Sequence, residues 1–476
     1  MDRGNGVIIA SSLGSFLAVV NTTSLLIAIP TILVNLRTNF LVVLWILIAY
    51  SIALTVLSPV FGKYSDIAGR KRMYVAGYLV FFVGSLAAGL SPDAYVLVGA
   101  RVVQGVAAAL LFSNSLAILT DTFRSVDLQR AIGINTAVVG LGMAIGPLVG
   151  GLLTEITWRA IFYFNTPIAV AGYFVASHSI QNTDKTPSGN GFDSRGAMVF
   201  SIFLVSTVIS LTLGPFLGWT DPLTVSLIAA AILSMAAFLT VERRSRDPIL
   251  DPDMFRNRRF SGSIFSSLLN AVSRSLLIFI LILYLQGPVG FTPLYSGLLM
   301  TPYAAFMGVT SFYSSRLMER FSERSLQATG LLLITISSFL LAATVSHYSY
   351  PVLGTLMSLA GTGIGLFSTP NSAVIMTSVS PNERGVAASN RTLFMNMGSV
   401  SGMTLVFTLL ASYVPVSVIG DVFLGTVSGA DRVSLGGFYL GLASSYVLAG
   451  VSSLVPLILT MSSRKVDREP VDGLSG

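Results

Sequence analysis

Apolar residues run along this chain in long stretches that alternate with short polar segments. Fourteen stretches hold about 20 or more predominantly apolar residues, the length that an α-helix needs to cross a membrane. They are residues 7–33, 40–61, 73–92, 95–119, 131–154, 158–178, 196–215, 222–241, 260–286, 293–314, 326–345, 349–376, 385–412 and 436–461. The pattern therefore predicts an all-α membrane protein with 14 transmembrane helices.

Composition supports this prediction. The chain has 476 residues, of which 53% are hydrophobic and 10% charged, with a mean hydropathy of +0.78, and water-soluble domains do not have such a composition. The apolar run from Val7 is too long for the core of a signal peptide, so we expect it to stay as the first span. Cysteine is absent, which excludes disulfides, a thiolate nucleophile and a cysteine zinc site, and we expect no metal.

The positive charges predict how the chain is oriented. With the N-terminus inside, nearly all Lys and Arg residues fall in inner segments, and the outer segments carry only Arg37, Arg159 and Arg432. Both termini are therefore expected in the cytoplasm, in a protein of the plasma membrane. The net charge of +7 belongs to these inner segments, so we expect no nucleic-acid partner.

An internal repeat divides the chain. The segment from Ser314 aligns with the segment from Phe61 at an offset of 253 residues, and parallel repeats of six spans are typical of membrane transporters. The offset exceeds six spans by about two, which we assign to residues 196–241. Polar linkers at 179–195 and 242–259 flank them; we expect the first to be flexible and the second to lie along the inner surface. The predicted domains are residues 1–180, 181–258 and 259–476, namely two pseudo-symmetric six-helix bundles and a central unit with two extra helices.

The segment 62–72 separates the second and third spans. Its glycines, acid and basic pair are Gly62, Gly69, Asp66, Arg70 and Lys71. The spacing resembles the signature between helices 2 and 3 of the major facilitator superfamily, and the two glycines would allow a tight turn. The resemblance implies that Asp66 faces the start of the span 385–412 and latches the two halves in the outward-facing state.

Two further segments strengthen the resemblance. Arg101 and Gln104 resemble the helix 4 motif of the superfamily, whose arginine is associated with proton transfer; the alternative is an arginine that bonds backbone carbonyls or reaches the outer interface. The fifth span resembles the motif of the superfamily's exporters through Gly140, Gly142, Gly146, Pro147, Gly150 and Gly151. We expect Pro147 to kink this span, and the face of Gly142, Gly146 and Gly150 to meet the span 293–314 across the interface between halves.

Together with the 14 spans, Trp158, Arg159 and Asn165 resemble the 14-span drug:proton antiporter branch. One position departs from it, because Asn21 stands where that branch usually carries an aspartate in helix 1. An amide cannot carry a proton, and no Asp, Glu or His lies at mid-membrane in the predicted spans.

Arg274 does lie at mid-membrane, roughly 20 Å along the ninth span at 1.5 Å per residue. The repeat aligns it with Asn21, so we expect the two residues to face each other across a central cavity. We expect Arg274 to supply a fixed positive charge to the substrate; the alternative is a structural arginine bonded to groups such as Asn270. Arg391 lies closer to the start of its span, where a structural role is favoured.

The sequence thus predicts a secondary transporter that exports small amphiphilic molecules by alternating access, as in multidrug efflux. It is expected to be a monomer in the lipid bilayer, with a small-molecule substrate, protons as a candidate coupling ion, and no cofactor or enzyme activity. Two alternatives stay open. One is a transporter of an anionic metabolite that uses Arg274 and Arg101, and the other is a protein of the same fold that has lost transport and acts as a sensor or partner-binding module.

Overall fold

The computed structural model describes residues 3–123, 125–181, 194–242, 254–347, 349–380, 384–415, 418–419, 422 and 432–462, and these form helices and turns without strands. The first eight helices are α1 (Arg3–Asn35), α2 (Phe40–Ala68), α3 (Arg70–Gly89), α4 (Ala94–Thr122), α5 (Ser125–Ile156), α6 (Ala160–Ser179), α7 (Ser194–Leu217) and α8 (Pro222–Glu242). After the short 3₁₀ helix η1 (Met254–Arg256) follow α9 (Arg258–Gln286), α10 (Pro293–Leu299), α11 (Thr301–Leu317), α12 (Glu323–Thr344), α13 (Tyr350–Thr377), α14 (Arg384–Ala411) and α16 (Arg432–Ser462).

Polar residues fix several of the helix starts. The side chains of Asn39, Asp93, Asn257, Thr292 and Ser322 each accept hydrogen bonds from backbone N–H groups in the first turn that follows. These N–H groups have no partner within the helix, so a side-chain acceptor at the preceding position satisfies them. The caps explain why the apolar stretches begin as helices at these points.

The described residues contain 12 helices that are long and apolar enough to cross a membrane, or 13 if the two parts of the bent helix α5 form one span. The remaining predicted span, residues 293–314, is broken at Met300 into α10 and α11, with Pro302 in the first turn of α11. All-α architecture is therefore confirmed, whereas a count of 14 spans is not. The linker residues 182–193 and 243–253, for which flexibility and a position along the inner surface were expected, lie outside the described residues.

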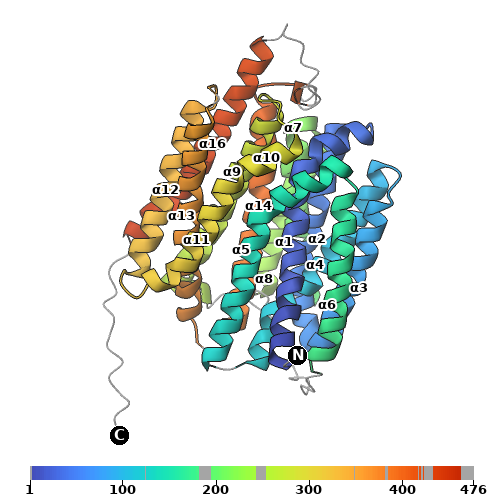
Figure 1. The fold of residues 1–476 in the computed structure, drawn as a ribbon, viewed down its shortest axis with the longest axis vertical. Helices are drawn as coiled ribbons and strands as arrows, with labels where there is room; N and C mark the ends of the chain where they lie inside the picture. The colour runs from blue at the N-terminus through green and yellow to red at the C-terminus, as the bar shows by residue number, and fades with distance from the viewer. Residues whose placement is uncertain are drawn as a thin grey trace.

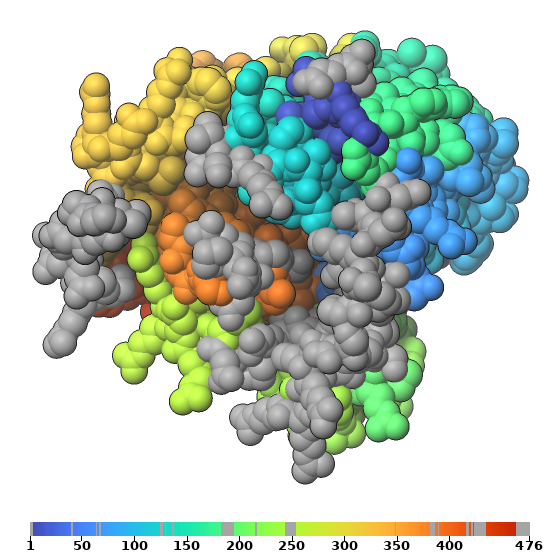
Figure 2. Space-filling view, turned by 90° about the horizontal axis from the view of Figure 1, so that it is seen from below, coloured from blue at the N-terminus to red at the C-terminus, as the bar shows by residue number. Residues whose placement is uncertain are grey.

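The helices pack as two groups that lie side by side (Figure 1). Helices α1–α6 contact one another and are called here the N-terminal bundle, and helices α9–α16 do the same and are called the C-terminal bundle. Seen from the end at which the N-terminus lies, the N-terminal bundle (blue to cyan-green) occupies one side and the C-terminal bundle (yellow to orange) the other (Figure 2). This end is called the near end below, and the opposite end the far end.

Helices α7 and α8 stand outside both bundles. Helix α7 packs against α2 of one bundle and α14 of the other, and α8 packs against α7. The buried cluster at this junction joins Val56 of α2, Phe200 and Leu204 of α7, Phe238 of α8 and Leu393 of α14. The extra pair therefore covers one seam between the bundles.

Candidate functional site at the bundle interface

The two bundles share their largest buried core at the far end, whereas toward the near end the described clusters are smaller and one of them joins the bundles through α7. The largest apolar cluster joins Ile29 and Ile32 of α1 with Ile280 and Leu283 of α9. Toward the near end, the N-terminal bundle has a cluster of its own that contains Leu17, and the C-terminal bundle has others. The bundles are thus held together more closely at the far end than at the near end.

Helix α5 bends by 43° between its segments Arg130–Met143 and Ile145–Ile156. Pro147 lies at the start of the second segment and cannot donate to the carbonyl of Met143, four residues before it. The kink that the sequence predicted is therefore confirmed.

Beyond this bend, α5 touches the C-terminal bundle through glycines. A Cβ atom at Gly151 would lie 2.6 Å from the carbonyl oxygen of Pro293 and 2.8 Å from Cα of Leu294. A Cβ atom at Gly297 would lie 2.6 Å from the carbonyl oxygen of Pro147. Since real Cβ atoms do not come this close to backbone atoms, only glycine fits at both positions. The far-end contact is therefore one of backbone against backbone.

One expectation about this helix is wrong. The face of Gly142, Gly146 and Gly150 meets α1 of the same bundle, because Cβ atoms there would contact Phe16, Thr23 and Ser24 respectively. The four-residue spacing indicated close helix packing but not which neighbour is packed. The adjacent face, with Pro147 and Gly151, is the one that meets α10.

Arg274 is half-buried and lies at the bundle interface, on the near-end side of the contact between Gly151 and Pro293. Its Nη1 is 3.6 Å from Sδ of Met143 on α5, and its Nη2 donates to Oγ of Ser399 on α14 at 3.5 Å. The 256-residue offset that relates Gly142 to Gly398 also relates Met143 to Ser399. Arg274 therefore contacts equivalent positions of both bundles. Sequence reasoning missed Met143 and Ser399, although the repeat offset could have indicated them.

Asn21 lies elsewhere. It is fully buried, and its Oδ1 accepts a hydrogen bond of 3.0 Å from Nδ2 of Asn165 on α6. Among the contacts of the described residues, none joins Asn21 to Arg274. The structure thus places Asn21 in a polar pair within the N-terminal bundle, and its position across a cavity from Arg274 stays a prediction.

Arg101 is also fully buried in the N-terminal bundle. Its Nε donates to the carbonyl of Ile46 at 3.0 Å and its Nη1 to Oε1 of Gln104 at 2.8 Å, while its guanidinium lies 4.3 Å from the ring centre of Tyr50. Gln104 in turn donates to Ser85 at 2.9 Å. The carbonyl bond fits the structural alternative for Arg101, and the network joins α2, α3 and α4.

The motif between helices 2 and 3 occupies helix ends rather than a loop. Gly69, with φ of 94°, is the single residue between α2 and α3 and requires glycine's freedom at positive φ. Gly62 lies inside α2, so its predicted role in the turn is wrong; a Cβ there would lie 3.7 Å from Cβ of Ser113 on α4. Lys71 lies in the first turn of α3. The backbone of Asp66 lies in α2, but its side chain is outside the described residues, so the latch stays a prediction.

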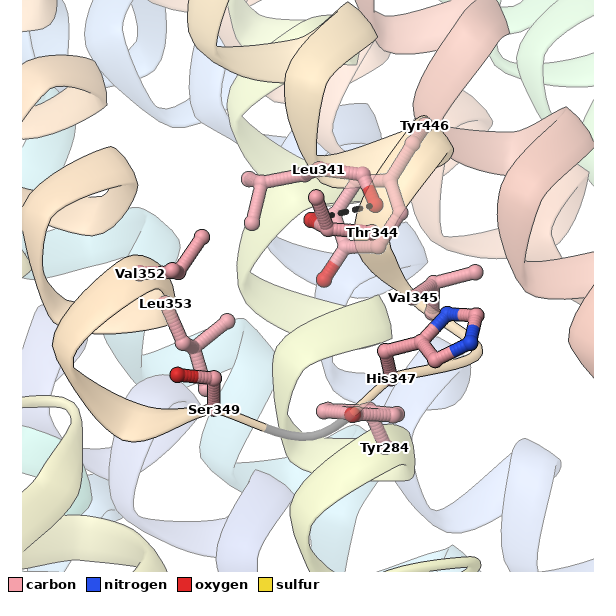
Figure 3. A pocket seen from close by; sticks show the side chains of 9 residues that line it. All are labelled: Tyr284, Leu341, Thr344, Val345, His347, Ser349, Val352, Leu353 and Tyr446. Atoms are coloured by element: carbon pink, nitrogen blue, oxygen red, sulfur yellow. Dashed lines mark hydrogen bonds between the residues drawn. The ribbon is translucent and has the colours of Figure 1, made fainter.

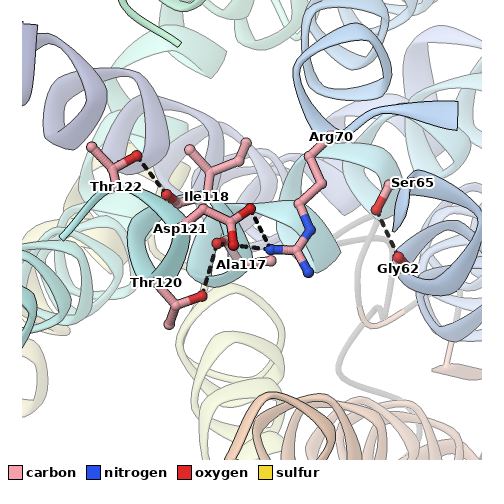
Figure 4. Close-up of polar contacts among 8 residues, drawn as sticks. All are labelled: Gly62, Ser65, Arg70, Ala117, Ile118, Thr120, Asp121 and Thr122. Carbon is pink, nitrogen blue, oxygen red and sulfur yellow. Dashed lines mark hydrogen bonds and ion pairs between the residues drawn. The ribbon is translucent and has the colours of Figure 1, made fainter. Parts of the chain in front are cut away.

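Arg70 of the same motif ties α3 to the end of α4 (Figure 4). Its Nη1 is 2.6 Å from Oδ2 of Asp121 and donates to the carbonyl of Ala117 at 3.1 Å. The motif therefore braces the near end of the N-terminal bundle internally.

A hollow lies inside the C-terminal bundle, at the ends of α9 and α12 and the start of α13 (Figure 3). Its lining residues are Tyr284, Leu341, Thr344, Val345, His347, Ser349, Val352, Leu353 and Tyr446. No residue of the Arg274 site belongs to this lining, and the hollow is mostly apolar.

Comparisons with known proteins agree with the fold and motifs. The family model of the Major Facilitator Superfamily matches residues 11–249 and 263–430. The multidrug resistance protein Stp of Mycobacterium tuberculosis is 30% identical over 410 residues, which cover 85% of this chain and 76% of that protein. The tetracenomycin C resistance and export protein of Streptomyces glaucescens is 30% identical over 417 residues, covering 87% and 77%.

Solved structures share the fold at low identity. A bacterial homologue of the human lysosomal transporter Spinster, solved in an inward-facing and unoccupied conformation, superposes with a TM-score of 0.67 at 14% identity. The match covers 97% of this chain and 96% of that one.

Proposed function

The chain belongs to the major facilitator superfamily, and from that premise we propose that this transporter exports small amphiphilic molecules by alternating access. Relatives named for multidrug resistance and for tetracenomycin C resistance and export support efflux as the direction. The observation that carries the proposal is the glycine contact between Gly151 and Pro293, because a seal without side chains can form and separate as two rigid bundles rock.

The described conformation has its far end closed. Toward the near end from Met143, a Cβ atom at Gly140 of α5 would meet nothing within 4 Å, in contrast to Gly151 at the far-end contact. Arg274, Met143 and Ser399 are half-buried, unlike the apolar residues of the shared far-end core. If the near end is cytoplasmic, as the positive charges indicate, this is the state that receives cargo from the cell interior.

The rest of the arrangement follows from this proposal. Both termini lie in the cytoplasm, the protein is a monomer of the plasma membrane, and residues 1–180 and 259–476 supply the two moving bundles. Rocking toward an outward-facing state would separate Gly151 from Pro293 and Met143 from Arg274. Ser399 would stay with Arg274, because both belong to the C-terminal bundle.

Coupling to protons would take a different route from the one usual in this branch. Asn21 cannot titrate, and helices α1, α9, α11 and α14 contain no Asp or Glu. Proton exchange would therefore use an acid at the rim, such as Asp66 or Glu155, or the substrate itself.

Flux in proteoliposomes tests the proposal. The purified full-length protein would be reconstituted, and uptake of an anionic dye, fluorescein, and a cationic dye, ethidium, followed with and without an imposed pH gradient. We expect accumulation that depends on the protein and is lost in Gly151→Leu, which blocks the far-end seal. Equal dye movement in empty liposomes, native protein and Gly151→Leu would argue against multidrug export.

A further inference from the structure

Hydrogen-bond donors without acceptors gather around Arg274. Asn270 lies one helical turn before Arg274 on the same face of α9, and Asn396 lies one turn before Ser399, which Arg274 contacts. The side-chain amide nitrogens of Asn270 and Asn396 have no acceptor within the described part of the chain. Both could donate to a molecule at this place.

Tyr303 and Arg391 extend the group. The Tyr303 hydroxyl and the Arg391 Nε are buried and, among the described residues, also lack partners. Arg391 lies on α14 about two turns before Ser399, which Arg274 contacts, and Tyr303 lies in the first turn of α11; the charge of Arg274 acts on both side chains. Asn270, Arg274, Tyr303, Arg391 and Asn396 are called the donor cluster below.

The donor cluster carries positive charge without compensation from its own helices. Helices α9, α11 and α14, which supply all five residues, contain no Asp or Glu. Two guanidinium groups that repel each other within membrane-spanning helices are costly unless an anion or water lies between them. Arg274, Arg391 and Asn396 are half-buried as residues, whereas the unpaired donor atoms of the cluster are closed off from solvent in the described conformation, so a ligand would have to displace side chains to reach them.

We infer that the donor cluster binds an anionic oxygen group, a carboxylate or an enolate, carried by the transported molecule. A guanidinium fork matches two adjacent oxygens, and the amide and hydroxyl donors supply the remaining hydrogen bonds. The opposite bundle presents the thioether of Met143, which suits an apolar ring. The cargo would thus hold its anionic end against the C-terminal bundle and its apolar body against α5. That the ligand is cargo rests on the proposed export function.

Two matched probes test this inference by binding rather than by flux, so its outcome is independent of the export experiment. 2-Naphthoate and 2-naphthamide share an apolar ring system, and only the first carries a carboxylate. Their binding to the full-length protein in detergent would be measured by isothermal calorimetry, in chloride and in gluconate buffers. Arg274→Gln and Asn270→Ala remove donors, Arg274→Lys keeps the charge, and Arg316→Gln removes an arginine that lies beside Phe312 and Tyr313 instead.

We expect 2-naphthoate to bind at least about tenfold more tightly than 2-naphthamide, because the carboxylate gains charge-assisted hydrogen bonds. Arg274→Gln should remove this preference, Asn270→Ala should reduce it, Arg274→Lys should restore part of it, and Arg316→Gln should leave it intact. Equal binding of the two probes, or a preference that survives Arg274→Gln, would overturn the inference. Complete displacement of 2-naphthoate by chloride at equal concentration would also overturn the inference, because the site would then serve an inorganic anion.

Discussion

Met143 and Ser399 occupy equivalent positions in the two halves of the chain, and both contact the guanidinium group of Arg274. One contact crosses the bundle interface and the other stays within the C-terminal bundle. Any movement of one bundle against the other must therefore change the surroundings of Arg274 on one side only. Such an asymmetry lets a single residue respond to the conformational state.

The first prediction concerns the far-end seal. Gly151→Ala places a Cβ against the Pro293 carbonyl, so the closed state should be disfavoured and transport should fall by tenfold or more. Gly133→Ala is the matched control on the same helix, because its Cβ would meet nothing within 4 Å. Dye flux of both variants in proteoliposomes gives the comparison, and equal rates would contradict the role of the seal.

Cysteine pairs test the same contact directly, since the native chain has no cysteine. Because Gly151→Cys itself crowds the seal, the reduced Gly151→Cys, Leu294→Cys double variant should already transport slowly. Oxidation should cross-link the bundles and stop the remaining transport, and reduction should restore it. A Gly133→Cys, Leu294→Cys pair should not cross-link. Cross-linking of the first pair that leaves flux unchanged would show that the contact does not need to open.

A second prediction separates packing from gating in α5. Gly146 packs on Thr23 of α1 within one bundle, so Gly146→Leu should destabilise that bundle rather than the seal. We expect a lower melting temperature and less folded protein in the membrane. A variant with native thermal stability but no transport would instead return Gly146 to the gating role that its spacing first indicated.

The third prediction concerns the buried network of Arg101. Gln104→Ala leaves Nη1 of Arg101 without its acceptor, and an unsatisfied buried charged donor costs about 1–3 kcal/mol or more. Ser85→Ala removes only a neutral acceptor of Gln104, so it should cost less. Thermal unfolding of the two variants measures the difference, and equal melting temperatures would show that the guanidinium finds another partner.

The fourth prediction concerns Asn21. Asn21→Asp introduces a carboxyl group that can still accept a hydrogen bond from Asn165 and can also exchange a proton. The amide of Asn21→Gln cannot exchange a proton. If this position serves coupling in the branch, the aspartate variant should gain flux driven by a pH gradient and the glutamine variant should not. No change in the gradient-driven flux of Asn21→Asp would exclude this position from coupling.

The sequence predicted the helices and the family well, because runs of about 20 apolar residues and a spaced motif are local signals. The kink at Pro147 was equally predictable, since proline acts on its own helix. The packing partner of each helix face was harder to predict. The stripe of Gly142, Gly146 and Gly150 indicated close approach, but α5 packs against α1 of its own bundle and against α10 and α11 of the other, and only tertiary structure selects between them.

Arg274 shows the same limit for the site. Its depth and its lack of an acidic neighbour could be read from the sequence, whereas the expectation that it faces Asn21 across a cavity stays a prediction. Aligned positions in a repeat share a place in their bundles, whereas their side chains follow local partners. For Asn21 that partner is Asn165, on a helix far away in the sequence.

Helix α7 connects the two bundles along one side of the molecule. It packs on α2 and α14 at once, through Phe200 and Leu204 against Val56 and Leu393, so it covers one of the two seams between the bundles. We expect α7 to limit the separation of the bundles along that seam, so that the end that opens in each state is widest at the opposite seam, between α5 and α11. Lipid-dissolved molecules would then enter from the membrane on one side only.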